Sequence, residues 1–426
     1  MNIVNSLNKP AENEYLNCIR CGLCLSVCPT YREHLTETAS PRGRVALARK
    51  SLEGDLPLSY NLVEQMYSCF GCMACNDLCP VGIKPAELAF AMRNIQEEIH
   101  PVGWKKTLFG NLLPHPARTE KAFFPVHIYE HSGLRRLFYA LGLMRLLPAQ
   151  VRDIEAMLPR IPQHPLRSVL PEITLPRGSE KFRLGFFLGC AQSLLFADQS
   201  AATVRVLARN GCTVVTPRQV ECCGMPARGY GRIDLVRKQA KHNIQIFENA
   251  CVTTIITDCA TCGSALKDYG ELLKDDPEWS ERAAGFSAQV RDVCEFLAEI
   301  PLEKPKGHLN ARVTYHDPCH LRRGQKVWQQ PRELLKLIDG LDFVELPEAD
   351  WCCGSAGSQL ITHYKTSIQV MQRKLNNIAS TNAQVVASGC PGCQMQLNTA
   401  MQRGKLKVRV VHPVTLLDEA YEAENG

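Results

Sequence analysis

The sequence predicts an α+β protein, in which a small helical, cysteine-rich unit precedes two copies of an α/β unit with mainly parallel strands. Three observations predict this fold. One run of four cysteines occurs twice in the first 80 residues, and helix-like patterns separate and follow the two runs. From residue 181 onward, strand-like and helix-like runs alternate. The same cysteine pattern occurs twice in this part, which indicates an internal duplication.

Length and composition are those of a globular protein with a sizeable core. The chain has 426 residues, of which 45% are hydrophobic and 22% charged. We expect four segments: a helical unit over 1–98, a proline-rich helical connector over 99–180, and the two α/β copies over 181–305 and 306–426. The net charge of +6 carries no inference of nucleic-acid binding.

The N-terminal sequence has no basic stretch followed by an apolar one, so we expect no signal peptide. No apolar run approaches the roughly 20 residues that span a bilayer. We therefore expect a cytoplasmic protein whose reduced cysteines serve as metal ligands. Contact with a membrane, at the inner face of the cell membrane, would be peripheral or through a partner.

The N-terminal cysteine runs read C-x2-C-x2-C-x3-C, and Pro29 and Pro80 follow them. This spacing holds a pair of cubane [4Fe–4S] clusters, in which the fourth cysteine of each run ligates the other cluster. Zinc sites more often use paired C-x2-C units, so we favour clusters over zinc. The predicted ligands are Cys18, Cys21, Cys24 and Cys79 for cluster 1, and Cys69, Cys72, Cys75 and Cys28 for cluster 2.

Helices are expected between and after these runs, at VALARKSLEG (45–54), NLVEQMYS (61–68) and PAELAFAMRNIQEEI (85–99). Such a small unit has few apolar residues near its clusters, so the metal supplies folding energy. Arg42 and Arg44 either screen the negative charge of the clusters or belong to a solvated basic loop.

The connector is rich in proline and basic residues and should hold one or two helices. Its segment 134–147, LRRLFYALGLMRLL, is apolar with three arginines. It could lie on a membrane surface or against a partner helix. We favour an ordinary buried helix, because a short apolar run usually belongs to a core.

The two α/β copies repeat the same order of elements. Strand-like runs at 182–189, 213–217 and 253–258 correspond to runs at 312–318, 343–347 and 383–389, with helix-like runs at 200–211 and 331–340. The offset between matching cysteines is 129, 130 or 131 residues. Cysteines follow the strands, where helix N-termini stabilise anionic thiolates.

Each copy supplies five cysteines, centred on Cys-Cys-Gly. They are Cys190, Cys222, Cys223, Cys259 and Cys262 in the first copy, and Cys319, Cys352, Cys353, Cys390 and Cys393 in the second. Five thiolates exceed the needs of one tetrahedral zinc, and an adjacent pair could hold two irons of one cluster or bridge two. A pair of zinc sites or redox-active thiols is the alternative. Gly224 and Gly354 should allow a backbone geometry that a Cβ atom would forbid.

The remaining cysteines, Cys212, Cys251 and Cys294, lack metal spacing, and we expect them to be small buried hydrophobic residues. His316 and His320 flank Cys319. Either could hydrogen-bond a cluster sulfur or relay a proton, although such histidines more often have a structural role.

Several cofactor motifs are absent from the sequence. There is no G-x-G-x-x-G after a strand, no Walker A motif, no H-E-x-x-H and no nucleophile elbow. We therefore expect no FAD, NAD or ATP site in this chain, and its catalytic residues stay unassigned. A chain that commits so many thiolates to iron is expected to move electrons.

At these motifs the chain resembles the iron–sulfur subunit of glycolate oxidase, through CIRCGLCLSVCPTY, SPRGRVALARKSLEG and CCGSAG. Similar arrangements occur in the iron–sulfur subunit of anaerobic glycerol-3-phosphate dehydrogenase and in lactate-utilisation proteins. The Cys-Cys-Gly pair is similar to the cysteine-rich subunit of heterodisulfide reductase. That resemblance implies a non-cubane [4Fe–4S] cluster on each group of five cysteines, called clusters 3 and 4 in chain order.

The resemblance implies an electron-transfer subunit. A separate FAD-binding dehydrogenase would oxidise a 2-hydroxy acid such as glycolate or lactate, and this chain would pass the electrons to a quinone or another acceptor. The isolated chain would not turn over substrate. The alternatives are a disulfide reductase of the heterodisulfide reductase type, a glycerol-3-phosphate dehydrogenase subunit, and a non-catalytic metal-binding module.

Overall fold

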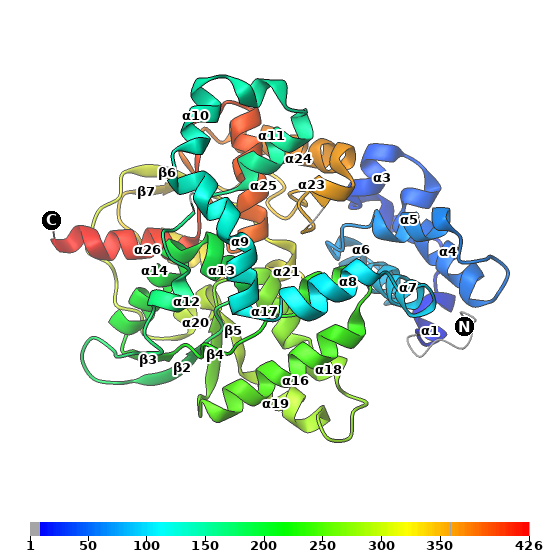
Figure 1. Ribbon diagram of the computed structural model, residues 1–426, viewed down its shortest axis with the longest axis horizontal. Coiled ribbons are helices and arrows are strands. Elements are labelled where there is room, and N and C mark those ends of the chain that lie inside the picture. Colours follow the sequence, from blue (N-terminus) through cyan, green and yellow to red (C-terminus); the bar gives the residue numbers. More distant parts are fainter. Residues whose placement is uncertain (1–8, 160, 358, 426) are drawn as a thin grey trace.

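The computed structural model describes residues 9–159, 161–357 and 359–425. A cluster of short helices at the N-terminal end lies beside a larger body that contains two sheets (Figure 1). The α+β prediction is confirmed, because the first part is helical and the rest combines helices with mainly parallel strands.

The N-terminal unit is a group of helices around a small apolar core. Its helices are α1 (Asn13–Leu16), α2 (Leu23–Ser26), α3 (Pro29–His34), η2 (Glu37–Ala39), α4 (Pro41–Leu52), α5 (Tyr60–Tyr67), α6 (Ala74–Asp77) and α7 (Pro85–Ile99). The three predicted helices correspond to α4, α5 and α7. Their inward faces meet through Val45, Met66 and Met92 among others, which leaves the cysteines on the short helices and loops around this core.

The two α/β repeats contain sheets of matching topology. The first sheet has the order β1–β3–β2–β4–β5 and the second β7–β6–β8–β9. All pairs are parallel except β1 with β3. The strands are β1 (Ile173–Thr174), β2 (Phe182–Phe186), β3 (Cys212–Val215), β4 (Thr254–Thr257), β5 (Val290–Asp292), β6 (Ala311–Tyr315), β7 (Leu341–Phe343), β8 (Val385–Ala387) and β9 (Arg409–Val411). The shared order supports the predicted duplication.

Helices surround both sheets. In the first repeat they are α13 (Cys190–Leu195), α14 (Ala197–Arg209), α15 (Met225–Gly229), α16 (Ile233–Asn249), α17 (Ala260–Lys267), α18 (Tyr269–Leu272), α19 (Ser280–Gln289) and α20 (Val293–Glu299). In the second they are α21 (Cys319–Arg322), α22 (Gln330–Lys336), α23 (Gln359–Thr362), α24 (Tyr364–Ser380), α25 (Pro391–Arg403), α26 (Pro413–Glu422) and η5 (Ala423–Asn425). One apolar core runs through both repeats, from Phe186 in β2 to Tyr315 in β6 and Leu417 in α26.

The sequence missed three strands. β5 and β9 extend each sheet at equivalent places, and β1 adds an antiparallel edge. Each is only two or three residues long, which is too short for a periodic pattern. The predicted strand 343–347 begins earlier, at Leu341.

Two of the three cysteines without metal spacing lie where predicted. Cys212 and Cys294 are fully buried in the shared core. The prediction for Cys251 is wrong, because this residue is exposed. Cys251 lies in the turn between α16 and β4 and has a positive φ of 50°, so its side chain is outside the packed layers.

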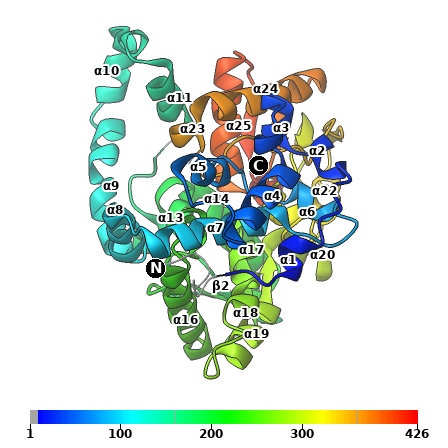
Figure 2. The same ribbon diagram turned by 90° about the vertical axis from the view of Figure 1, so that its right-hand side faces the viewer.

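The connector is more helical than expected. It contains α8 (Gly103–Lys106), a π-helical turn η3 (Thr107–Leu112), α9 (Pro116–His131), α10 (Leu134–Ala140), η4 (Leu143–Leu146), α11 (Ala149–Met157) and α12 (Leu166–Val169). Figure 2 shows α9 and α10 along one edge of the molecule. The Asp153 carboxylate of α11 accepts a hydrogen bond from Tyr364 and pairs with Arg403, each at 2.7 Å, which attaches this arm to the second repeat.

The expectation of a buried helix at 134–147 is wrong. The segment forms two short helical pieces broken at Gly142, which has a φ of 68°. Leu137, Leu141 and Leu146 are 51%, 63% and 81% exposed. Neither repeat packs over these side chains, so their apolar character does not produce burial. Among the described residues, no helix is both long and apolar enough to cross a bilayer.

The N-terminal unit docks on both repeats. Arg93 of α7 donates to the Gly229 carbonyl of the first repeat at 2.9 Å. On the second repeat, His363 lies 2.8 Å from the Glu64 carboxylate. Figure 2 shows α3 beside α24, where His34 and Thr366 hydrogen-bond at 3.0 Å. The N-terminal unit is therefore held against both repeats.

Candidate metal centres

One cavity of the N-terminal unit brings together the cysteines predicted for cluster 1. Its lining includes Cys18, Cys21, Cys24 and Cys79. Arg42 also lines it, pairs with Glu37 at 2.7 Å and donates to the Arg20 carbonyl at 3.2 Å. A guanidinium is thus held beside the thiols by a structural ion pair.

A second cavity brings together the cysteines predicted for cluster 2. Its lining includes Cys28, Cys69, Cys72 and Cys75. Arg44 lines it as well and is buried, donating to the hydroxyls of Thr30 and Ser68 at 3.0 Å each. Burial raises the pKa of Cys28, while the Arg44 charge opposes that rise. Since Arg44 lies inside α4, it does not belong to a solvated loop.

The five cysteines of the first repeat come from three loops that follow parallel strands. Cys190 opens α13 after β2, Cys222 and Cys223 follow β3, and Cys259 and Cys262 flank the start of α17. Hydrogen bonds join Cys190 to Cys222, and join Cys223 to Cys222 and Cys262. The sulfur of Cys259 accepts from the Cys262 backbone N–H at 3.4 Å. The fold thus brings all five thiols into one group.

The second repeat builds an equivalent group. Cys319 opens α21 after β6, Cys352 and Cys353 follow β7, and Cys390 and Cys393 flank the start of α25. The sulfurs of Cys353 and Cys393 are 3.4 Å apart. Cys352 hydrogen-bonds Cys353, and Cys390 hydrogen-bonds Cys393.

Both Cys-Cys-Gly turns need their glycine. Gly224 and Gly354 have φ values of 88° and 92°, in the left-handed region that favours glycine. A Cβ atom at Gly354 would lie 2.7 Å from the Ser367 carbonyl oxygen. At Gly224 it would lie 2.7 Å from a methyl group of Val236. The predicted reason for these glycines agrees with this geometry.

In both repeats the second cysteine of the pair is the more readily ionised. Hydrogen bonds from Cys222 and Cys262 hold the pKa of Cys223 well below its usual range. Cys352 and Cys393 do the same for the pKa of Cys353. The thiolate is the form of cysteine that binds metal. The Cys-Cys-Gly loop of each repeat therefore favours the binding of a cation.

The two groups of five meet at their C-x2-C motifs. Cys259 of the first repeat hydrogen-bonds Cys390 of the second. The hydroxyl of Thr261 lies 3.3 Å from the Cys390 sulfur, and the Ala260 N–H donates to the Gly389 carbonyl at 2.9 Å. The duplication therefore places its two cysteine groups against each other.

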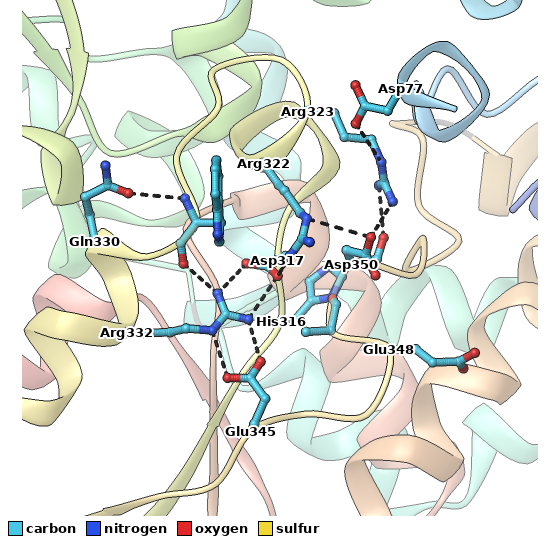
Figure 3. Close-up of polar contacts among 12 residues, drawn as sticks. Asp77, His316, Asp317, Arg322, Arg323, Gln330, Arg332, Glu345, Glu348 and Asp350 are labelled. Carbon is cyan, nitrogen blue, oxygen red and sulfur yellow. Dashed lines mark hydrogen bonds and ion pairs between the residues drawn. The ribbon is translucent and has the colours of Figure 1, made fainter. Parts of the chain in front are cut away.

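The second group also meets the N-terminal unit. A hydrogen bond from Cys352 lowers the pKa of Cys72 to about 6. Phe70 and Val370 pack around this contact. Figure 3 shows Arg323 between Asp350 of the second repeat and Asp77 of α6. A cysteine predicted for cluster 2 thus touches one predicted for cluster 4.

A charge network fixes the loop that carries Cys319. The buried carboxylate of Asp317 receives Arg322 and Arg332 at 2.8 Å each (Figure 3). The Asp317 N–H also donates to the Ala349 carbonyl at 3.0 Å. The loop after β6 is therefore tied to the loop that leads to Cys352.

Sequence reasoning missed two buried cations beside the cysteines. Arg93 donates to the carbonyls of Met66 and Cys69 at 2.6 and 2.7 Å. Lys374 of α24 donates to the Ala349 carbonyl at 3.1 Å, and burial lowers its pKa to about 8. For Arg93, a lone basic residue on the apolar face of the predicted helix 85–99 is the signal that could have found it; no helix is predicted around Lys374.

The donor set fits iron–sulfur clusters. All 21 cysteines lie in the described part of the chain and are free thiols. Of these, 18 form four compact groups of four or five sulfurs. Soft thiolates in such number suit iron–sulfur clusters better than single cations of harder character.

Comparison with protein families assigns most of the chain. The family model described as a 4Fe-4S dicluster domain matches residues 14–83. The model described as a cysteine-rich domain matches residues 184–267 and 313–398. The model described as the linker region of the glycolate oxidase iron-sulfur subunit matches residues 102–158. These matches support iron–sulfur binding and the repeated cysteine-rich units.

Curated relatives match over nearly the whole chain. The protein named probable glycolate oxidase iron-sulfur subunit of Bacillus subtilis is 38% identical over 419 residues, which cover 96% of this chain and 94% of that protein. The glycolate oxidase iron-sulfur subunit of Escherichia coli is 29% identical, with coverage of 96% and 94%. Lactate utilization protein A of Oceanobacillus iheyensis is 32% identical over 55% of this chain and 96% of its own length.

Proposed function

The chain belongs to the glycolate oxidase iron–sulfur subunit family, and from that premise we propose that it carries electrons from a flavoprotein partner to a quinone or another acceptor. As a family member it is an oxidoreductase subunit that holds iron–sulfur clusters. The proposed substrate of the complex is a 2-hydroxy acid such as glycolate or lactate, which the names of the relatives support.

One observation carries the proposal: an unbroken series of thiol contacts connects the two repeats to the N-terminal unit. Its contacts join, in order, Cys190, Cys222, Cys223, Cys262, Cys259, Cys390, Cys393, Cys353, Cys352 and Cys72. Electron transfer between clusters is efficient only when they are close, and such contacts bring neighbouring ligand sets together.

The proposed ligand sets follow the four groups. The N-terminal cavities would hold cubane clusters, on Cys18, Cys21, Cys24 and Cys79 and on Cys69, Cys72, Cys75 and Cys28. Each repeat would hold a non-cubane cluster on its five cysteines. When bound, the clusters supply one-electron carriers. They would divide the electron pair that a flavin delivers.

The chain's own residues position and balance these groups. Arg44, Arg93 and Lys374 place buried positive charge beside cysteine groups, which offsets the negative charge of thiolates and sulfide. Apolar side chains such as Phe70 and Val370 exclude water from the contact between Cys72 and Cys352. Both features tune cluster potentials.

A reconstitution experiment tests whether the flavoprotein oxidises the substrate while this chain transfers the electrons. The chain, purified without oxygen, should contain about 16 irons and should not oxidise glycolate or lactate alone. With its flavoprotein partner it should reduce a quinone analogue. Cys352→Ser should stop that reduction, whereas Cys251→Ser, at the exposed cysteine outside all groups, should leave it unchanged. Oxidation of the hydroxy acid by the isolated chain would refute the proposal.

For a complex that reduces a membrane quinone, we place this chain at the inner face of the cell membrane. The exposed Leu137, Leu141 and Leu146 lie on the connector arm close to Arg136 and Arg145. Apolar side chains with flanking basic residues suit the surface of an anionic bilayer. Flotation with anionic vesicles tests this location, and no binding by either the chain or its complex would contradict it.

A second candidate function is disulfide reduction. The contact of Cys259 with Cys390 favours it, because a disulfide held between the repeats could receive one electron from each side. Two electrons and two protons would then give two thiols. Turnover of a small disulfide with a low-potential donor would support this function, and absence of turnover over a panel of disulfides would exclude it.

A further inference from the structure

His316 is a buried histidine with one ring nitrogen that meets no oxygen or nitrogen partner. It follows β6 in the loop that leads to Cys319, and its side chain is 1% exposed. Its Nε2 atom has no oxygen or nitrogen partner among the described residues, and the ring interacts with the Cys353 thiol. Buried polar atoms in proteins are nearly always paired. A buried ring nitrogen placed against cysteine sulfur therefore calls for an explanation.

The other ring nitrogen fixes the tautomer. Nδ1 of His316 lies 3.1 Å from the Ala349 carbonyl oxygen. A carbonyl oxygen can only accept, so Nδ1 carries the proton and donates. With Nδ1 as the donor, Nε2 is the nitrogen left to face the cysteine sulfurs. Metal-ligating histidines typically donate their second N–H to a backbone carbonyl in this way, which holds the ring in place.

This nitrogen lies next to cysteine sulfurs. A ring nitrogen of His316 and the sulfurs of Cys353 and Cys393 lie within 4.8 Å of one another, and all three residues are buried. The Ala349 carbonyl also accepts from the Lys374 ammonium at 3.1 Å and from the Asp317 N–H at 3.0 Å. The carbonyl that orients the imidazole is thus itself fixed, and the three donor atoms lie close enough together to bind one metal ion.

The first repeat lacks this donor. Phe187 precedes Cys190 by three residues, as His316 precedes Cys319. Phe187 is fully buried and stacks near Phe247, with ring centroids 6.2 Å apart. Likewise, Asn243 stands in α16 where Lys374 stands in α24. Two sites of common origin therefore differ by one imidazole and one ammonium group.

We propose that Nε2 of His316 ligates an iron of the cluster held by the second group of five cysteines, so that the two clusters of the repeats differ in coordination. This inference rests on the proposed cluster at that group. The known use of imidazole in place of thiolate in Rieske centres shows that such a ligand is compatible with iron–sulfur chemistry and changes its redox behaviour.

Isotope-resolved EPR on the full chain tests the assignment. Protein is prepared without oxygen from a histidine auxotroph supplied with either ¹⁴N- or ¹⁵N-histidine. The signal of the second-repeat cluster is identified as the one lost in Cys393→Ser. Its pulsed EPR spectrum should show a strong nitrogen hyperfine coupling that changes with the isotope. This readout needs no variant at His316 and no enzymatic turnover.

Variants localise the coupling. His316→Gln and His316→Phe should abolish the nitrogen hyperfine coupling. The phenylalanine variant introduces the residue type that the first repeat has at the equivalent position. His320→Gln is the matched control, because Nδ1 of His320 lies 3.5 Å from the Cys319 sulfur of the same group. The control should retain the strong coupling. Retention of the coupling in His316→Gln would overturn the assignment.

The failures of the two proposals are distinguishable. If the second-repeat signal and its irons are present but show no histidine coupling, the ligand assignment is wrong while the proposed cluster stands. If iron analysis finds about 12 irons instead of about 16 and Cys393→Ser removes no signal, the cluster itself is absent. In that case both proposals fail.

Discussion

At the scale of single residues, the second Cys-Cys-Gly turn has little tolerance for change. The Gly354 N–H donates to the Cys352 sulfur at 3.4 Å, and the Ser367 hydroxyl donates to the Gly354 carbonyl at 2.8 Å. The turn lets the two adjacent cysteines contact different partners. Cys352 contacts Cys72, and Cys353 contacts Cys393. Only a residue that adopts the left-handed backbone conformation and has no side chain allows both of these contacts.

Gly354→Ala should therefore destabilise the chain and deplete iron from the second repeat. The expected cost is about 1–3 kcal/mol, from backbone strain together with the clash against Ser367. Anaerobic urea unfolding and iron analysis measure it.

Gly285→Ala is the matched control, since Gly285 lies in α19 with open space at its Cβ position. Alanine there should be neutral or stabilising by up to about 1 kcal/mol. Equal effects of the two substitutions would contradict the role given to the Gly354 turn.

At the scale of elements, helix N-termini organise the cysteine groups. Cys259 and Cys390 are the N-cap residues of α17 and α25, and Cys190 and Cys319 open α13 and α21. The free N–H groups of a helix N-terminus favour negative charge. The parallel strands β2, β4, β6 and β8 thus each deliver a cysteine to a position where a thiolate is stabilised.

The N-cap of α20 predicts a pH dependence of stability. Asp292 Oδ1 accepts from the Cys294 N–H at 2.8 Å, while Oδ2 is buried and unpaired. Burial raises the pKa of Asp292 to about 7. The folded chain binds this proton more tightly than the unfolded chain. The contribution of this proton to the free energy of unfolding is fully present below about pH 4. It is lost as the pH rises to 7.

Asp292→Asn should remove this dependence, because the amide keeps the cap and cannot ionise. From pH 5 to pH 8, we expect the free energy of unfolding of Asp292→Asn to rise by on the order of 2 kcal/mol relative to that of the wild type. Urea unfolding at both pH values measures the difference. Asp275→Asn, at an exposed residue, should follow the wild type. Parallel curves for Asp292→Asn and the wild type would refute the prediction.

At the scale of the whole molecule, docking of the N-terminal unit decides which cysteine groups are neighbours. The second repeat contacts this unit through Cys352 and Cys72, and the first repeat contacts the second through Cys259 and Cys390. The proposed order of carriers is therefore cluster 1, cluster 2, the second repeat and then the first, in either direction of flow.

Arg93 holds this arrangement together. Its guanidinium donates to the carbonyls of Met66, Cys69 and Gly229, which belong to two separate units. Arg93→Lys cannot reproduce this planar fork and leaves buried acceptors unpaired. We expect a loss of about 2–4 kcal/mol and a slower exchange of electrons between the N-terminal unit and the repeats.

Urea unfolding and stopped-flow reduction of the loaded chain measure these two effects. Arg136→Lys, on the exposed face of α10, is the control and should change neither. An unaltered rate and stability in Arg93→Lys would show that the docking does not depend on this residue.

The sequence by itself determined the four cysteine groups, the duplication and most elements, because these can be read from residue spacing and local patterns. A cysteine spacing such as that from Cys18 to Cys28 is readable without a fold, and so is the helical period of 85–99. The same local reasoning misjudged 134–147 and Cys251, since burial depends on what packs over a segment. Only the tertiary structure placed Cys72 against Cys352, Cys259 against Cys390, and His316 beside Cys353. Such contacts arise from how whole units dock, and no short-range pattern encodes them.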